Sequence, residues 1–143
     1  MREKLLVSAC LLGVSCRYDG KSKGREEVSA LAERYDLIPV CPEQLGGLPT
    51  PREPSEILGD RVVSRTGEDV TGPFRKGAEE TLRIARLTGC RKALLKSKSP
   101  SCGSGLIYDG TFSRTLAEGD GVTARLLKEN GLEVFGEGET ALL

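Results

Sequence analysis

Apolar and polar positions follow two distinct patterns along this chain. Four short apolar runs predict β-strands, at residues 5–9, 37–40, 92–96 and 132–135. Between these runs, apolar side chains recur three or four residues apart, which is the spacing of one face of a helix. That spacing predicts helices over residues 28–35, from Pro73 to a stop at Gly89, and from a cap at Asp120 or Gly121 to a stop at Gly131.

This order of elements predicts the fold class. Strands that alternate with helices form parallel sheets with helices on both faces. We therefore expect an α/β protein, a Rossmann-like three-layer sandwich with a mostly parallel sheet. The chain has 143 residues, the length of one domain. Residues 1–143 are predicted to form that single domain.

Two segments are predicted to be loops. Residues 42–60 contain four of the seven prolines, and a loop of this length inside a compact domain is usually functional. Val62 and Val63 follow it and predict a short edge strand or hairpin. Residues 97–105 are rich in serine, proline and glycine, which favours a second loop.

Composition excludes several classes of protein. The 21 basic and 21 acidic residues balance, which argues against a dedicated binder of duplex nucleic acid. Histidine is absent, so a Ser-His-Asp triad and a histidine-ligated zinc are excluded. No apolar run approaches the roughly 20 residues that cross a bilayer. No signal peptide is apparent, and we expect a cytoplasmic protein that does not contact membranes.

The cysteines are odd in number and predict a reducing compartment rather than a disulfide framework. They are Cys10, Cys16, Cys41, Cys90 and Cys102. Cys10 and Cys41 directly follow predicted strands, and Cys102 lies in the loop after a third strand. Because the carboxyl ends of parallel strands meet at one edge of a sheet, these three thiols are expected to converge there.

Converging thiols of this kind indicate a metal centre. Structural zinc usually takes four ligands with paired C-x-x-C spacing, which this chain lacks. An iron–sulfur cluster suits separated loops and ligation by thiolates alone. Three thiolates would leave one iron open, as a Lewis-acid catalyst requires. Cys90 is interpreted as a buried packing residue. Cys16 stays open as a fourth ligand, a resolving thiol or a packing residue.

Polar residues near these cysteines are candidates for binding and catalysis. Glu43 lies two residues after Cys41 and could act as a general acid or base. Ser99 and Ser101 precede Cys102 and could bind a substrate through their hydroxyls, and Lys98 could hold an anion.

A second polar set, Arg17, Tyr18 and Asp19, follows Cys16 and is a candidate for substrate binding, although Arg17 and Asp19 could simply form a local ion pair. Residues 81–102 contain six basic residues and no acidic one, which permits an anionic or nucleotide-like substrate.

Several segments together resemble the signatures of the thiouracil desulfurases, a bacterial family long catalogued as a domain of unknown function. The segments are residues 6–14, 16–20, 39–52 and 99–103. The resemblance covers nearly the whole chain and includes residues 69–71 and 108–113.

That resemblance implies a [4Fe-4S] cluster held by Cys10, Cys41 and Cys102, with one iron not ligated by protein. It implies a desulfuration without redox change, in which the sulfur of 2-thiouracil binds the open iron and water replaces sulfur at the ring carbon. Uracil and a cluster-bound hydrosulfide would result. By the same resemblance, Glu43 would shuttle protons, and Ser99 or Ser101 would help to bind or activate.

The expected partner is a small thiolated nucleobase. A dedicated nucleic-acid partner is not expected, but a nucleoside or a thiolated tRNA stays open as the substrate, and the chain could be a monomer or a homodimer. Two alternatives are kept. One is a metal-free thiol redox or persulfide-handling enzyme that uses Cys10 and Cys16. The other is a cluster-binding sensor without catalysis.

Overall fold

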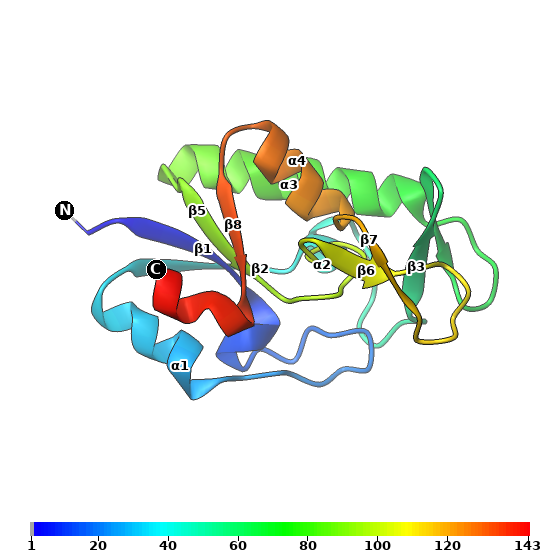
Figure 1. The fold of residues 1–143 in the computed structure, drawn as a ribbon, viewed down its shortest axis with the longest axis horizontal. Coiled ribbons are helices and arrows are strands. Elements are labelled where there is room, and N and C mark those ends of the chain that lie inside the picture. Colours follow the sequence, from blue (N-terminus) through cyan, green and yellow to red (C-terminus); the bar gives the residue numbers. More distant parts are fainter. Residues whose placement is uncertain (1) are drawn as a thin grey trace.

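A four-stranded parallel sheet forms the centre of the molecule in the computed structural model, which describes residues 2–143 (Figure 1). The strands are β1 (Lys4–Ser8), β2 (Asp36–Val40), β5 (Lys92–Leu95) and β8 (Glu133–Gly136). They lie in the order β2-β1-β5-β8, and every neighbouring pair is parallel. All four strands were predicted from the apolar runs, and the mostly parallel α/β fold is confirmed.

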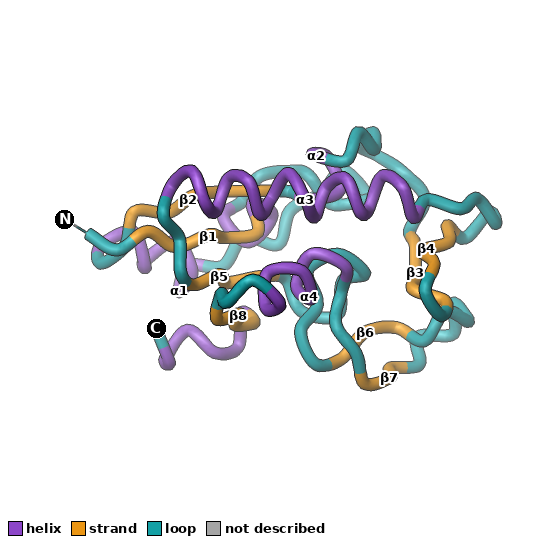
Figure 2. The backbone as a smooth tube through the Cα atoms, turned by 90° about the horizontal axis from the view of Figure 1, so that it is seen from above, coloured by secondary structure: helices purple, strands orange, loops and turns teal. Residues whose placement is uncertain are grey.

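Helices cover both faces of this sheet (Figures 1 and 2). One face carries α3 (Thr71–Thr88) and α4 (Val122–Glu129); the other carries α1 (Glu26–Ser29) and the 3-10 helices η2 (Ala30–Glu33) and η3 (Glu137–Leu142). Side chains of β1 alternate between the two layers. Leu5 and Val7 pack with Val28 on one face, and Leu6 packs with Leu82 on the other. The three-layer prediction is thereby confirmed.

Two of the predicted helix boundaries need correction. The helix expected over residues 28–35 starts two residues earlier and is split into α1 and η2. Helix α3 begins at Thr71 rather than at Pro73, and Asp69 Oδ1 accepts the backbone N–H of Thr71 at 2.9 Å where the chain enters the helix. Pro73 is still tolerated there, since its missing N–H would have no partner within the helix. The stop at Gly89 is confirmed by its φ of 76°.

The segment 42–60, predicted as a loop without regular structure, contains two elements. Helix α2 (Pro42–Leu45) follows β2 after one residue, and β3 (Ser55–Leu58) pairs antiparallel with β4 (Arg61–Ser64). The hairpin expected around Val62 is therefore present. Pro42 occupies the first position of α2 and Pro54 directly precedes β3, and proline is compatible with regular structure at both positions, whereas Pro49 and Pro51 lie in the loop between the two elements.

A second hairpin was not predicted. Strands β6 (Leu106–Tyr108) and β7 (Leu116–Glu118) pair antiparallel. Both hairpins lie at the end of the molecule opposite the N-terminus, beyond the carboxyl ends of the central strands (Figures 1 and 2). The 3-10 helix η1 (Ala9–Leu12) follows β1 directly at the same edge of the sheet. Within residues 2–143, no helix combines the length and the apolar character needed to cross a bilayer.

Candidate active site

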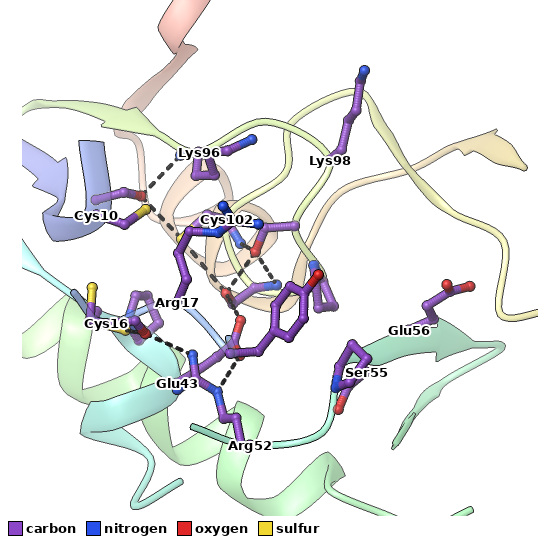
Figure 3. Close-up of a pocket in the computed structure, with 18 of the residues that line it drawn as sticks. Cys10, Cys16, Arg17, Glu43, Arg52, Ser55, Glu56, Lys96, Lys98 and Cys102 are labelled. Atoms are coloured by element: carbon purple, nitrogen blue, oxygen red, sulfur yellow. Dashed lines mark hydrogen bonds and ion pairs between the residues drawn. The ribbon is translucent and has the colours of Figure 1, made fainter. Parts of the chain in front are cut away.

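A pocket of about 300 Å³ lies beyond the carboxyl ends of β1, β2 and β5 (Figure 3). Four cysteines line it, namely Cys10, Cys16, Cys41 and Cys102. They come from η1, the loop after η1, the residue after β2 and the loop after β5. Parallel topology thus brings together the three thiols that the sequence analysis placed at one sheet edge, and it adds Cys16 beside them.

Cys90 lies apart from this group. It precedes β5 at the amino ends of the strands, packs against side chains of α3 and α4, and is 6% exposed. Its sulfur lies 3.2 Å from the hydroxyl of Thr88. Its position fits the packing role inferred from the sequence.

Three of the cysteines at the pocket, Cys16, Cys41 and Cys102, have thiol pKa values raised by their surroundings. Burial raises the pKa of Cys102 to about 12, against an opposing hydrogen bond from Ser8 Oγ at 3.2 Å. The pKa of Cys41 is raised as well, first by a hydrogen bond with Cys16 and then by burial. A hydrogen bond with Cys10 raises the pKa of Cys16. A metal centre that takes these sulfurs as thiolates must therefore displace protons, so assembly of the centre is coupled to proton release.

The cysteine sulfurs are the donors that this pocket offers to a metal centre. Among the described residues, no group of three or more histidine, cysteine, aspartate or glutamate side chains is arranged to hold one metal ion. The three cysteines that follow the strands instead come from separate loops around one pocket and offer sulfur donors alone. Separated thiolates without nitrogen or oxygen ligands are the donors that iron–sulfur clusters take.

Helix α2 brings a carboxylate into this pocket. Cys41 caps the helix, Pro42 occupies its first position, and Glu43 follows. The helix lies against α3 with almost no space between the two backbones, since a Cβ on Gly46 would come within 2.0 Å of the Pro73 carbonyl oxygen. Glycine is required for that contact. Close packing on a long helix therefore fixes the place of Glu43 beside Cys41.

Both carboxylate oxygens of Glu43 are engaged. Oε1 accepts a hydrogen bond from Nε of Arg52 at 2.9 Å, and Oε2 accepts one from Oγ of Ser101 at 2.8 Å. The Arg52 side chain is 7% exposed and that of Glu43 is 15% exposed. Arg52 also donates to the Cys16 carbonyl at 3.0 Å (Figure 3). One buried arginine thus fixes the carboxylate and joins it to the loop that carries Cys16.

The two serines have different tasks. Ser99 Oγ accepts the backbone N–H groups of Ser101 and Cys102 at 3.1 and 3.0 Å. Because those two bonds occupy both of its lone pairs, its own proton is directed to Ser101 Oγ, 3.0 Å away. Ser101 in turn donates to Glu43. The hydroxyls form a directed chain from Ser99 to Ser101 to Glu43, in which Ser101 touches the carboxylate and Ser99 shapes the turn.

The other predicted substrate-binding residues are spread around the pocket. Arg17 and Tyr18 line it, and so does Lys98, although Figure 3 shows the ammonium group of Lys98 pointing away from the thiols. Asp19 does not line the pocket. It pairs with Arg17 at 3.6 Å and accepts the N–H of Lys21 at 3.0 Å, so it stabilises the loop.

Sequence reasoning missed several residues that line the pocket. They are Arg52, Glu56 and Arg65, together with Tyr108, Phe112 and Arg114 from the β6–β7 hairpin. One signal was available: the chain has six aromatic residues, and Tyr18, Tyr108 and Phe112 all line this pocket. Nothing local marks Arg52, because one arginine in a proline-rich segment has the same pattern as a solvated surface residue.

Comparisons with known proteins show which family and which solved structure this chain resembles. The 2-thiouracil desulfurase family matches the chain over residues 5–139. A solved structure described as the [4Fe-4S]-dependent thiouracil desulfidase TudS is 49% identical, with a TM-score of 0.92 over 99% of this chain and 97% of that one. The uncharacterized protein YbbK of Bacillus subtilis is 44% identical over 145 residues, which cover 94% of this chain and 96% of YbbK.

Proposed function

The chain belongs to the 2-thiouracil desulfurase family, as its motifs predicted, and we propose that it hydrolyses the carbon–sulfur bond of 2-thiouracil or a related thiolated base. The reaction converts 2-thiouracil and water to uracil and hydrogen sulfide without net oxidation or reduction. We propose that Cys10, Cys41 and Cys102 hold a [4Fe-4S] cluster with one iron not ligated by protein. The similarity to TudS, a [4Fe-4S]-dependent thiouracil desulfidase, supports the cluster for this chain.

The proposal rests above all on the position of Glu43. Its carboxylate accepts a hydrogen bond from Ser101, whose neighbour Cys102 lines the same pocket as Cys10 and Cys41. A base is thereby held next to the thiols, in a chain that has no histidine to serve instead. When bound, the cluster would supply a Lewis-acidic iron with an affinity for soft sulfur.

Glu43 is assigned the proton transfers. It takes one proton from water while the water oxygen bonds to the ring carbon and the π electrons of the carbon–sulfur double bond move to sulfur, and it passes that proton to sulfur directly or through the Ser101 hydroxyl. It then takes the second proton from the new hydroxyl as the ring carbonyl forms and the remaining carbon–sulfur bond breaks, and it returns this proton to the departing hydrosulfide, which leaves as hydrogen sulfide. Arg52 keeps the carboxylate in place during both transfers, because it donates to the oxygen that Ser101 does not use.

Turnover by anaerobically prepared, cluster-loaded protein tests this function. We expect loss of 2-thiouracil with equal formation of uracil and sulfide, and in water labelled with heavy oxygen the label should enter the uracil carbonyl. Glu43→Gln should keep its iron and lose roughly 100-fold or more in turnover. Glu27→Gln, on the exposed surface of α1, is the matched control and should retain full activity.

Two results would favour the alternatives. Full activity after removal of iron by a chelator would support a metal-free thiol enzyme. An intact cluster without turnover of 2-thiouracil or other thiolated bases would support a sensor. Equal turnover by Glu43→Gln and the parent protein would remove Glu43 as the base while leaving the desulfurase function in place.

A further inference from the structure

Backbone strain is concentrated at the pocket. Among the described residues, three non-glycine residues have positive φ: Lys98 at 66°, Phe112 at 56° and Arg114 at 62°. Residues other than glycine rarely adopt this left-handed region, because their Cβ atom crowds the following carbonyl oxygen. All three residues line the pocket. Such strain persists where surrounding contacts enforce it, and it typically marks functional positions.

Phe112 is the apolar residue of the three, and the hydrophobic core does not account for it. Within residues 2–143, none of the three core clusters includes Phe112, whereas Phe74 and Phe135 pack into them. Its side chain is half-buried near the tip of the β6–β7 hairpin and faces the pocket. Its ring is therefore held at the pocket wall without a packing role in the interior.

Glu56 holds Phe112 in this conformation. From β3, its Oε1 accepts the backbone N–H of Gly110 at 3.0 Å and that of Phe112 at 3.1 Å. The hairpin tip also lies directly on β3, since a Cβ on Gly110 would come within 2.8 Å of the Ile57 carbonyl oxygen. A single carboxylate and a glycine contact thus fix the backbone that places the ring.

We propose that Phe112 determines the specificity of the pocket for planar nucleobases by stacking its ring on the face of the substrate ring. This inference rests on the proposed function, because it requires a thiolated base in the pocket. Stacking between a base and an aromatic side chain is tolerant of the exact base and strengthens binding roughly 5- to 100-fold. Tyr18 and Tyr108 line the same pocket, so Phe112 is one of three aromatic side chains there.

Binding of uracil to cluster-loaded protein, measured by anaerobic calorimetry together with the melting temperature, tests the role of Phe112. Phe112→Asn should weaken uracil binding about tenfold or more. The same variant should melt at the same temperature or higher, because asparagine adopts positive φ more readily than phenylalanine. Phe112→Tyr should bind within about threefold of the parent, whereas Phe112→Leu, which keeps apolar bulk without an aromatic face, should not. Leu87→Asn, at a 79% exposed position on α3, should change neither quantity.

The opposite pattern would overturn the proposal. A drop of several degrees in the melting temperature of Phe112→Asn, with unchanged uracil affinity, would make the ring a structural residue. Affinity retained by Phe112→Leu would exclude stacking. In both cases the desulfurase function would stand if the parent turns over 2-thiouracil. A parent that neither binds uracil nor turns over 2-thiouracil would remove the proposed function, and this inference with it.

Discussion

The two edges of the central sheet bury cysteines to the same degree but surround them differently. At the amino edge, Cys90 is 6% exposed and contacts the hydroxyl of Thr88. At the carboxyl edge, Cys102 is 4% exposed and contacts the hydroxyls of Ser8 and Ser101. The Ser101 hydroxyl also donates a hydrogen bond to the Glu43 carboxylate. Burial alone therefore does not distinguish these two thiols. What distinguishes Cys102 is a set of polar groups from separate segments that share its pocket.

The two edges of the sheet also differ in how far their ion pairs are exposed to solvent. At the amino edge, Lys4 and Asp36 pair at 3.4 Å with side chains 33% and 46% exposed. At the carboxyl edge, Arg52 and Glu43 pair at 2.9 Å with side chains 7% and 15% exposed. Removing charges from water is costly, and a buried pair is weak evidence of a stabilising role. The pair at the carboxyl edge is better explained by its function of holding Glu43, because buried and partnered titratable groups gather at active sites.

The strongest test of this comparison removes the thiols one at a time. Cys10→Ala, Cys41→Ala and Cys102→Ala should each lose most of the roughly four irons per chain and the brown colour of reconstituted protein. Cys90→Ala should keep both, because its thiol lies at the other edge. Iron and acid-labile sulfide are counted per chain under anaerobic conditions. Iron lost from Cys90→Ala but kept by Cys102→Ala would reverse the assignment of the two edges.

The next effect is on stability and concerns the two ion pairs. Arg52→Ala leaves the 15% exposed carboxylate of Glu43 without its charged partner and should lower the free energy of unfolding by about 3 kcal/mol. Asp36→Asn breaks an exposed pair and should cost about 0.5 kcal/mol. Arg52→Lys should recover part of the loss only, since lysine lacks the planar fork that reaches both Glu43 and Cys16.

Urea unfolding of the three variants measures these differences. Equal losses for Arg52→Ala and Asp36→Asn would show that the carboxyl edge is as well solvated as the amino edge, and the assignment of Arg52 as the residue that fixes Glu43 would then fail.

A smaller effect on stability is expected at Cys16, and the iron content of its variant shows whether three or four cysteines hold the cluster. Cys16→Ala should keep the iron content of the parent and lower stability by about 1 kcal/mol, the cost of removing one small buried group. If Cys16 were a fourth ligand, the variant would lose iron as Cys41→Ala does. Cys90→Ala is the matched control, since it removes a similarly buried thiol away from the pocket.

The sheet and the meeting of the thiols could be predicted because each depends on a regular pattern. Apolar runs marked the four strands, and parallel topology then placed Cys10, Cys41 and Cys102 at one edge. The pairing of Arg52 with Glu43 could not be predicted, because it depends on how a proline-rich segment folds back around the pocket.

The β6–β7 hairpin was missed for a related reason. Its strands have three residues each, too few for an alternating pattern to be recognised. The strain at Phe112 is a property of the backbone and leaves no trace in residue type.

The smallest effect is a pH dependence at the amino edge. Burial raises the pKa of the Cys90 thiol above its ordinary value of 9.0, against the opposing hydrogen bond with Thr88. The folded protein keeps this thiol neutral above pH 9.0, whereas in the unfolded chain the thiol ionises once the pH exceeds 9.0. The stabilisation is therefore complete below about pH 9 and is lost as the pH rises towards the folded pKa.

Cys90→Ala removes the titrating group and isolates this contribution. Between about pH 8 and pH 10, the melting temperature of the cluster-loaded parent should fall more steeply than that of Cys90→Ala, so the advantage of the parent over the variant should shrink as the pH rises. Parallel curves would mean that Cys90 ionises equally in both states and is not sealed from water. At the carboxyl edge we expect Cys102 in loaded protein to contribute the opposite slope, because a thiolate bound to iron carries no proton, whereas the thiol of the unfolded chain keeps its proton below about pH 9. The two edges would then differ in titration as well as in their neighbours.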